Sequence, residues 1–566
     1  MQAPTSNENA LQRKLRRVNA LRNERESWRN HWREISEYQT PRSGRYFLTD
    51  RNKGDKRHNN IYDNTAIFGI RTLASGLMSG MTSPARQWFR LTLADKELAE
   101  SGAVKLWLHQ VAQIMRAVFA ASNTYRALHS MYEELGAFGT SASIMLPDFD
   151  NVVHHFPLTI GEYALGANYK GEVDTLTREF QMTVGQAGDE FGLDACSESV
   201  RNLYLRGDID KWIDVTHVIE PNRKRDGTKL DNGNMKWASC YFEPGQAKDN
   251  KFLRESGFKR FPVLAPRWVV TANDVYGQSP GMECLGDVKQ LQHQQLRKSQ
   301  AIDYKTNPPL QVPTAYKDFA KARLPGGVFF IDSLTPSSGV RSAFDVDINL
   351  EHLMHDIGDV RERIRSAYYA DLFLMLANDT RSGVTATEVA ERHEEKLLML
   401  GPVLERLHNE LLSPMIDQTF DHCVAAGILP DAPPEMQDME LTVEFVSTLA
   451  QAQRAVAAAG ADRVLTTVGN LAAMKPDIID KIDFDQVVDD YAEMFGVNPA
   501  IIVPDDVVAK IRAERAQAAQ AAQMAATAPQ AVESAKTASE IDAGSLQDVL
   551  GMFQGYGSPT AQEVEA

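Results

Sequence analysis

The 566-residue sequence is poor in cysteine and has no long hydrophobic run. Its cysteines, Cys196, Cys240, Cys284 and Cys423, lie far apart, and none belongs to a CxxC pair. This spacing excludes a disulfide framework and a zinc site built from paired cysteines, and it predicts reduced, buried thiols in a protein made in the cytoplasm. No apolar segment approaches the roughly 18 residues that a membrane-spanning helix needs. The N-terminal segment MQAPTSNENALQRKLRR has no apolar core of the kind found in secretory signals, so we expect neither a membrane span nor export.

The sequence also lacks the motifs of the common catalytic sites. Residues 161–166 come nearest to a phosphate-binding loop, but the Lys-Ser or Lys-Thr that must follow is absent. His393-Glu394 begins like a zinc-peptidase helix, but Leu397 stands where the second histidine belongs. No GxSxG motif occurs. We therefore expect no catalytic residues, no metal site and no cofactor, and we do not expect an enzyme.

Positive charge is in the minority: 60 Lys and Arg face 76 Asp and Glu, for a net charge of −16. A protein that grips duplex DNA by neutralising phosphates should be basic, so tight DNA binding is disfavoured. The charge is uneven, because residues 1–60 carry a net +7 whereas residues 431–510 carry a net −10.

The basic charge at the N-terminus lies on one predicted helix, residues 10–38. Apolar residues recur there at helical spacing, and arginines fill the other face. Two interpretations stay open. The arginine face is either a solvated surface, which we favour, or a surface that faces a partner or DNA.

The first part of the chain mixes helices and strands, so it is predicted to be α+β. One helix follows Asp63 and ends before Pro84, and a single long helix is predicted from about Ala103 to Leu135. Between residues 140 and 272, short β-branched and aromatic runs alternate with turns, and the clearest pattern is a hairpin with its turn at Asp226-Gly227.

Two long helices then flank a compact insert. The first covers about residues 280–305 and is ended by Pro308-Pro309, and the second begins near Asn349. Residues 371–384 begin apolar and end in turn-forming residues.

A long helix is predicted next, opened by the capping box Thr385-x-x-Glu388 and ended near Gly427. Pro402 and Pro414 should kink it. Residues 439–446 alternate like a strand that could return to the first sheet. Further helices follow, among them an Ala- and Gln-rich one at 505–527, and residues 528–566 have the composition of a disordered tail.

Several segments together resemble a known family. The most specific runs from the second helix into the following strand, and shorter ones follow in order at Phe138-Gly139-Thr140, Pro266 to Trp268 and Tyr276 to Pro280. The residues of the first segment that we single out are Leu73, Gly76, Gly80, Thr82, Ser83, Pro84, Arg86, Trp88 and Phe89. Over roughly residues 10–430 the chain resembles the portal, or head-to-tail connecting, proteins of short-tailed bacteriophages.

The resemblance implies a helix-rich α+β fold that assembles as a ring of twelve copies at one capsid vertex. It divides the chain into an N-terminal basic helix with a wing (1–278), a first stem helix (279–305), a clip (306–345), a second stem helix (346–370), a tunnel loop (371–384), a long kinked helix with a return strand of the wing (385–447), a helical crown (448–527) and a flexible acidic tail (528–566).

The resemblance also implies which residues meet DNA. The tunnel loop would present Asn378, Asp379, Thr380, Arg381, Ser382 and Gly383. Lys289, Arg297, Lys298 and Lys305 are the candidate cations of the stem channel, and Gly401-Pro402 is the expected kink of the long helix. An acidic channel wall would keep the duplex centred, while a few cations touch its phosphates weakly.

The expected partners are further copies of the chain, double-stranded DNA bound without regard to sequence, the major capsid and scaffolding proteins, the large terminase subunit, and tail or adaptor proteins. The expected location is the portal vertex of the virion. The alternative interpretations are a tail adaptor or an ejected internal protein and, against the missing phosphate-binding loop, a terminase-like packaging enzyme.

Overall fold

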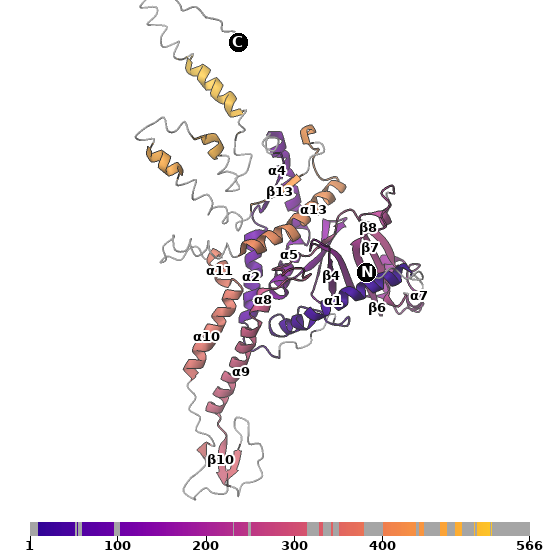
Figure 1. Cartoon of the computed structure of the whole chain (residues 1–566), viewed down its shortest axis with the longest axis vertical. Helices are drawn as coiled ribbons and strands as arrows, with labels where there is room; N and C mark the ends of the chain where they lie inside the picture. Colours follow the sequence, from indigo (N-terminus) through magenta and orange to yellow (C-terminus); the bar gives the residue numbers. More distant parts are fainter. Residues whose placement is uncertain are drawn as a thin grey trace, which may run out of the picture.

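The structure is a computed structural model in which a body of helices and sheets carries a long two-helix projection (Figure 1). None of the helices in the described part is long and apolar enough to cross a membrane. The structure describes residues 9–50, 54, 59–95, 102–229, 231–246, 251–313, 328–331, 341–342, 350–377, 400–436, 441–446, 464–471, 482–488, 503, 507–520 and 522.

The largest sheet has five antiparallel strands in sequential order. They are β4 (Tyr163–Ala167), β5 (Val173–Thr183), β6 (Trp212–Pro221), β7 (Trp237–Phe242) and β8 (Arg254–Phe258). Strands β6 and β7 form the hairpin that the sequence predicts, with Thr216 opposite Phe242 and Pro221 opposite Trp237.

Helices cover both faces of this sheet. Helix α1 (Ala10–Tyr38) packs Leu11 and Val18 against Val218 and Phe242. On the opposite face, α6 (Val184–Phe191) and α7 (Glu198–Leu205) share a second cluster with the alternate strand positions. Because neighbouring side chains of a strand point to opposite faces, residues of one strand can serve both clusters.

A helical layer joins the sheets to the projection. It contains α2 (Thr65–Met81), α4 (Gly102–Ala121) and α5 (Thr124–Phe138), with a small sheet of β3 (Val152–Leu158), β2 (Ala142–Asp148) and β9 (Val263–Leu264) beside them.

The prediction of one helix from Ala103 to Leu135 is wrong, because α4 and α5 are separated at Ser122 and Asn123. The Asn123 amide group donates to the carbonyl oxygen of His155 at 2.7 Å, and its oxygen accepts from the His155 backbone N–H at 2.9 Å. This pair of bonds fastens the interruption to β3.

The projection consists of α9 (Leu285–Thr306) and α10 (Leu350–Ala367), which we call the stem. A short helix, α8 (Pro280–Glu283), precedes α9, and α11 (Ala370–Ala377) follows α10. The first stem helix is therefore interrupted at Cys284, and the second ends at Ala367 instead of residue 370.

Helix α10 ends at Ala367 because the backbone of Tyr369 has a φ of 53°. This value lies in the left-handed region, which a right-handed helix cannot continue through. The described part of the insert between the stem helices is a three-stranded sheet, with β10 (Leu310–Pro313) between β11 (Val328–Ile331) and β12 (Arg341–Ser342).

The later long helix is described from residue 400 onward. Its irregularity is a π-helical turn, η4 (His408–Leu412), which leads into α13 (Ser413–Ala425). Pro414 has no N–H to donate to the carbonyl of Glu410, which accounts for the looser turn at this point. Gly401 and Pro402 stand at the start of the described part of this helix, so the kink expected there stays a prediction, and the distortion that the structure describes lies about two turns later. Gly427, with φ +66°, follows the helix as expected.

The return strand β13 (Leu441–Phe445) pairs antiparallel with β1 (Phe89–Leu93). The two form a sheet of their own, so the expectation that this strand rejoins the first sheet is corrected. Residues 464–471, 484–488 and 507–520 are helical, as expected for the C-terminal part, whereas residues 528–566 lie outside the described residues.

Candidate functional site

The two stem helices run antiparallel in a constant register. Near the body, Arg363 donates from Nε and Nη2 to Oδ1 of Asp287 at 3.2 and 3.0 Å. Further out, the Gln294 amide donates to Oδ2 of Asp356. The two contacts are seven residues apart on α9 and seven residues apart, in the opposite direction, on α10.

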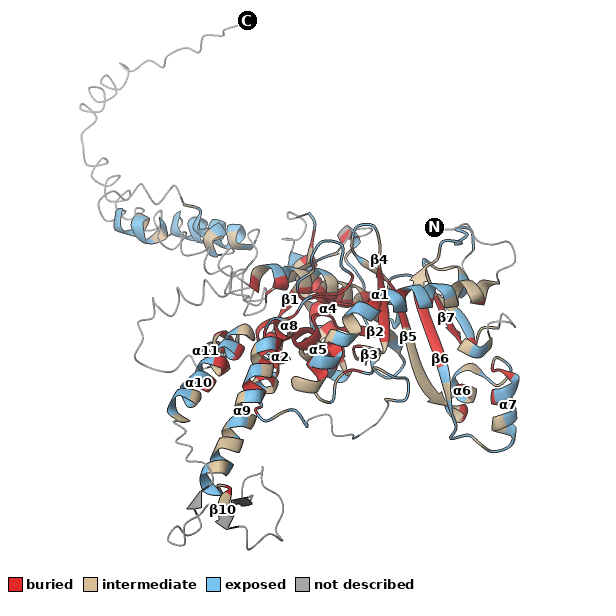
Figure 2. Ribbon diagram, turned by 60° about the horizontal axis from the view of Figure 1, so that its bottom comes forward, coloured by how far each residue is buried: buried red, intermediate tan, exposed pale blue. Residues whose placement is uncertain are grey.

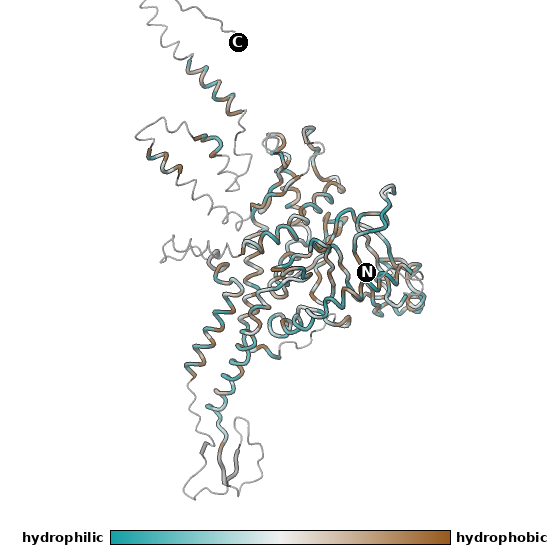
Figure 3. The backbone as a smooth tube through the Cα atoms, in the orientation of Figure 1, coloured by the Kyte–Doolittle hydropathy of each residue, from teal (hydrophilic) through white to brown (hydrophobic). Residues whose placement is uncertain are grey.

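Burial divides the stem into two halves. In the upper half, which we define as residues 285–292 of α9 and 357–367 of α10, apolar side chains enter the main core. In the lower half, residues 293–306 and 350–356, no residue of either helix is buried. Figure 2 shows the buried residues gathered near the body, and Figure 3 shows hydrophilic residues recurring along both helices. The lower half therefore offers its surface to something outside the described part of the chain or to solvent.

A buried carboxylate, Asp63, ties both stem helices to the start of α2. Asp63, whose side chain is 5% exposed, accepts from Arg361 Nη2 at 2.6 Å and from Gln295 Nε2 at 3.0 Å. Oε1 of Gln292 in turn accepts the backbone N–H of Asp63 at 2.8 Å. Burial alone would raise the pKa of Asp63, but hydrogen bonds from Thr65 and Arg361 hold that pKa below its usual value. The carboxylate is thus ionised and joins three helices.

The segment that carries the family resemblance proves to be a packing element. Leu73, Gly76 and Gly80 lie on the buried side of α2. A Cβ atom on Gly76 would come 2.1 Å from the ring of Phe373 in α11, which means that only glycine allows the two helices this distance. The glycine pattern therefore sets how closely the helix after the stem approaches α2.

The rest of the segment turns the chain from α2 into β1. Thr82 lies within hydrogen-bonding distance of the Tyr132 hydroxyl, at 3.2 Å, and Trp88 and Phe89 are fully buried. Three further residues of the segment, Ser83, Pro84 and Arg86, are partly or fully exposed on the turn. These motif residues build a rigid junction, and the exposed turn is the part left available for contacts.

The four candidate stem cations do not share one face of α9. Lys289 Nζ lies 2.8 Å from Glu34 Oε2 of α1 and over the ring of Tyr38. Its charge therefore already serves a contact within the chain.

Lys298 and Lys305 follow Gln294 by four and eleven residues, which places them on the face of α9 that is turned toward α10. Arg297 is exposed on the outer face of α9, where it bonds to His293 and Gln300 of its own helix. Of the four candidates, Arg297 is the one directed outward.

The expected tunnel loop is helical in its first half. Residues 371–377 belong to α11, and Leu372 and Phe373 are buried against the core. Their apolar character explains the helix, because burial of these side chains against α2 favours an ordered, packed segment. The apolar residues of this segment were expected to pack on the wing or on a neighbouring subunit, and for Leu372 and Phe373 the contact lies within the chain. Asn378 to Gly383 lie outside the described residues.

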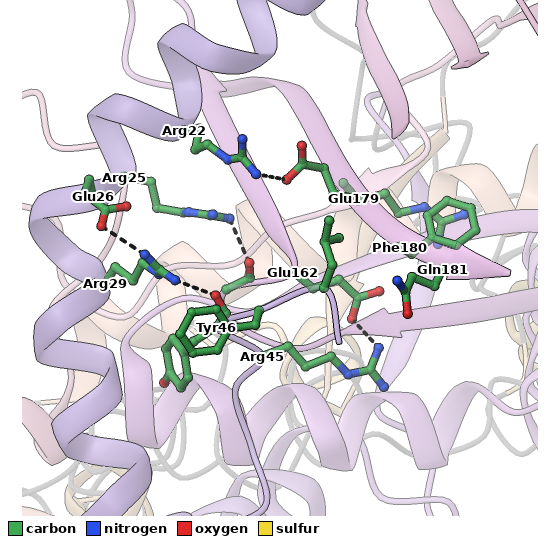
Figure 4. A pocket seen from close by; sticks show the side chains of 14 residues that line it. Arg22, Arg25, Glu26, Arg29, Arg45, Tyr46, Glu162, Glu179, Phe180 and Gln181 are labelled. Carbon is green, nitrogen blue, oxygen red and sulfur yellow. Dashed lines mark hydrogen bonds and ion pairs between the residues drawn. The ribbon is translucent and has the colours of Figure 1, made fainter. Parts of the chain in front are cut away.

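A pocket of about 390 Å³ lies between α1, the loop at residues 45–48, the turn at Gly161-Glu162 and strand β5 (Figure 4). Its charged side chains are largely engaged with one another. Arg22 bonds Glu179 at 2.7 Å, and Arg45 bonds Glu162 at 3.0 Å. Arg25, which is 7% exposed, donates to the backbone oxygen of Gly161 at 3.0 Å. These contacts hold α1 on the sheet, so part of the predicted arginine face is internal.

The thiol groups of the described core are buried. All four cysteines are free and buried, as the sequence predicts. Burial raises the pKa of the Cys284 thiol to about 12 and that of Cys423 to about 11. In the part of the chain that the structure covers, no group of three His, Cys, Asp or Glu side chains could hold a metal ion.

Two ionic contacts were missed by sequence reasoning. Asp63 was read as the residue before a helix, and nothing in the sequence pairs it with Arg361. Arg267 is buried and donates from Nη2 to Glu410 Oε1 at 2.6 Å, which joins the segment after β9 to the π-helical turn. The signal that could have marked Arg267 is an arginine within an otherwise apolar run, Phe261 to Val270.

The chain is similar to known proteins over most of its length. A family profile described as "Bacteriophage head to tail connecting protein" matches residues 11–502. A protein of Bordetella phage BPP-1 named "Probable portal protein" is 56% identical over 96% of this chain and 98% of its own. The "Portal protein" of Salmonella phage epsilon15 is 43% identical over 98% of this chain and 99% of its own. Among solved structures, a chain of the virion of a native gene transfer agent particle aligns with 70% of this chain and 89% of its own, with 10% identity and a TM-score of 0.29.

Proposed function

The chain belongs to the family of bacteriophage head to tail connecting proteins, and from this premise we propose that it forms a ring of twelve copies at one vertex of the capsid. The ring encloses a channel through which double-stranded DNA is packaged and later ejected. The observation that carries the proposal is the match to portal proteins over almost the whole length of both chains.

The stem supports this proposal because it is incomplete on its own. Its upper half is anchored in the body by buried apolar residues and by Asp63, whereas its lower half has no buried residue. A helical hairpin of about 33 Å that extends away from its own core gains its packing from neighbours in a closed ring.

The charge of the chain supports sliding contact with DNA instead of tight binding. With a net charge of −16 per copy, an assembled ring repels the phosphate backbone over most of its surface. We assign weak phosphate contact to Arg297 on the stem and to Arg381 at the tip of a tunnel loop formed by residues 378–383.

We assign the remaining roles by position in the chain. The clip, residues 306–345, lies between the stem helices and docks the large terminase subunit during packaging and a tail adaptor afterwards. Residues 1–278 with 385–447 form the wing, which meets the capsid and scaffolding proteins. Residues 448–527 form a crown that faces the capsid interior. The protein acts without a cofactor and is not itself an enzyme.

Particle size and shape test the proposal. Twelve copies of the 63.0 kDa chain have a mass of about 756 kDa, which native mass spectrometry measures directly, and negative-stain images should show a ring with a central hole. A protein that stays monomeric or dimeric across salt concentrations would overturn the ring. ATP hydrolysis by the purified chain would instead favour a packaging enzyme.

A further inference from the structure

We propose that the open edge of strand β5 receives an extended acidic segment of another protein, which adds to the sheet as a further strand opposite Gln181. The segment that fits carries a carboxylate between two apolar residues. The inference goes beyond the proposed ring, because it concerns an edge that a single copy of the chain already presents.

Strand β4 ends before its neighbour does. It pairs with β5 from Val173 to Arg178, and the Glu179 N–H donates to the carbonyl oxygen of Glu162 at 3.2 Å. On its other side, β5 stays paired with β6 as far as Thr183. Among the described residues, the last part of β5 therefore has a strand on one side only.

The backbone of Gln181 faces the open side. Val184 donates its N–H to the carbonyl oxygen of Lys211 at 2.8 Å, which continues the ladder between β5 and β6. Backbone groups of successive residues in a strand point to opposite edges, so even-numbered residues of β5 face β6 and odd-numbered ones face away from it. The Thr183 N–H donates to Oε1 of Gln186 at 3.0 Å. In the described part of the chain, the N–H and C=O of Gln181 have no partner on this edge.

The pocket beside this edge has the charge for an acidic strand. Phe180 and Gln181 line it together with Arg45 and Glu162 (Figure 4). Five arginines and three glutamates belong to the lining, so positive charge is in excess. Unpaired backbone groups at a strand edge are a template for another strand, and extended peptides are bound in this way. The excess charge favours a peptide that brings a carboxylate.

The arginines of the pocket can take a further carboxylate although they already have partners. Arg22 and Arg45 bond Glu179 and Glu162, but their side chains remain 45% and 43% exposed. Each guanidinium carries five N–H donors, and one carboxylate does not use them all. An incoming carboxylate can therefore share these arginines without breaking the contacts that hold α1 on the sheet.

Pairing across the edge decides which side chains the added strand needs. Directly paired residues of antiparallel strands share a face of the sheet. Gln181 shares the face of Glu179, which Arg22 of α1 contacts at 2.7 Å, so the residue paired with Gln181 lies on the arginine side. Phe180 and Met182 lie on the opposite face, against the cluster formed with α6 and α7. The added strand therefore presents a carboxylate opposite Gln181 and apolar side chains opposite Phe180 and Met182.

Peptide binding to the full chain tests the added strand. The probe is the peptide Thr-Val-Glu-Val-Thr, with a fluorophore at its N-terminus and an amide at its C-terminus, and fluorescence anisotropy measures its Kd. Replacing its glutamate with lysine should weaken binding at least about tenfold. Equal affinity for the two peptides, or no measurable binding of the probe, would overturn the proposal.

N-methylation separates strand addition from simple attraction between charges. A methyl group on the glutamate nitrogen removes the N–H that faces Gln181, and affinity should fall at least about fivefold. The matched control carries its methyl group on the nitrogen of the following valine, whose N–H points away from β5, and should bind as the parent peptide does. Equal effects of the two methyl groups would show that no strand is added.

Variants of the chain test the same contact from the other side. Gln181→Pro removes the outward N–H but no ladder bond to β6, so the sheet should fold and the probe should bind at least about fivefold more weakly. Gln181→Ala keeps the N–H and should bind the probe as the wild type does. If circular dichroism shows that Gln181→Pro does not fold, the two methylated peptides decide the question by themselves.

The assembly state distinguishes the occupants of the edge. Equal binding of the probe to dissociated subunits and to assembled rings is expected for a site that serves another protein. Binding that is lost on assembly would show that a second copy covers the edge, and it would overturn this inference without affecting the proposed ring. A chain that forms no ring would overturn the proposed function alone, since the edge belongs to the single copy.

Discussion

The upper and lower halves of the stem are continuous helices, but they are built in different ways. The upper half packs apolar residues into the core, and its Arg361 donates to the buried carboxylate of Asp63. The lower half has no buried residue, and its charges are exposed. The difference shows that the upper half is stabilised by packing within this chain, whereas the described residues give the lower half no such packing. The lower half is the part that the proposed ring would cover.

The largest loss of stability is expected from a substitution where α2 and α11 approach each other closely. Gly76→Ala should destabilise α2 by about 3 kcal/mol, because the new methyl group would overlap the Phe373 ring. Native-state hydrogen exchange of the α2 amides measures the loss. Gly358→Ala on α10 is the control: nothing lies within 4 Å of its added Cβ atom, and a gain of about 0.5–1 kcal/mol is expected. Equal effects at both glycines would contradict the packing difference.

Asp63→Asn should have the next largest effect, a loss of about 2 kcal/mol in the free energy of unfolding, because it leaves Arg361 beside a neutral group at the base of the stem. The figure is smaller than for a fully buried pair because the Arg361 side chain is 37% exposed. Asp359→Asn, an exposed carboxylate on the same stem, is the matched control and should change stability by less than about 0.5 kcal/mol.

The pH dependence of Asp63 gives an independent readout. Its pKa in the folded protein is below the usual value, so the unfolded chain binds this proton more tightly. The contribution to stability is therefore present above about pH 4 and is lost as the pH falls through the folded pKa. Hydrogen exchange between pH 3 and 6 should show a smaller acid loss in Asp63→Asn than in the wild type. An identical acid loss would show that Asp63 is not the group responsible.

Arg363→Ala tests a half-exposed ion pair between the two helices of the upper half. Its ion pair with Asp287 is half exposed, with side chains 52% and 32% accessible, so a loss of about 0.5 kcal/mol is expected. A double-mutant cycle with Asp287→Ala, read from exchange of the α9 amides, isolates the pair from other effects of each change. A coupling above about 2 kcal/mol would mean that the pair is screened from water more fully than its exposure indicates.

Arg297→Gln should have the smallest effect on the unassembled chain, within about 0.2 kcal/mol, because its contacts are exposed and within one helix. The same variant should weaken retention of packaged DNA, because we assign weak phosphate contact to Arg297. Thermal midpoints of the dissociated subunit measure the first effect, and DNA retained in packaged particles measures the second. A large loss of stability in the dissociated subunit would mean that Arg297 takes part in packing within the chain, as the residues of the upper half do.

Regular patterns made much of the secondary structure predictable. Helix α1 was expected at its observed bounds because its apolar residues recur at helical spacing. The β6–β7 hairpin followed from its turn signal, and the buried thiols followed from their spacing. The errors occurred where a distant residue intervened, as with the His155 backbone that holds Asn123 between α4 and α5.

The sequence by itself determined the family and the order of the elements, because these depend on local periodicity and on a specific run of residues in and after α2. Tertiary structure alone decided what those residues do. Gly76 is required by the Phe373 ring, Asp63 finds Arg361 across nearly 300 positions, and Lys289 is drawn to Glu34 of α1. A helical pattern states which face is apolar, but it does not state which distant helix will cover that face. The charges of the lower stem are the clearest case, since no residue in the described part of the chain buries them.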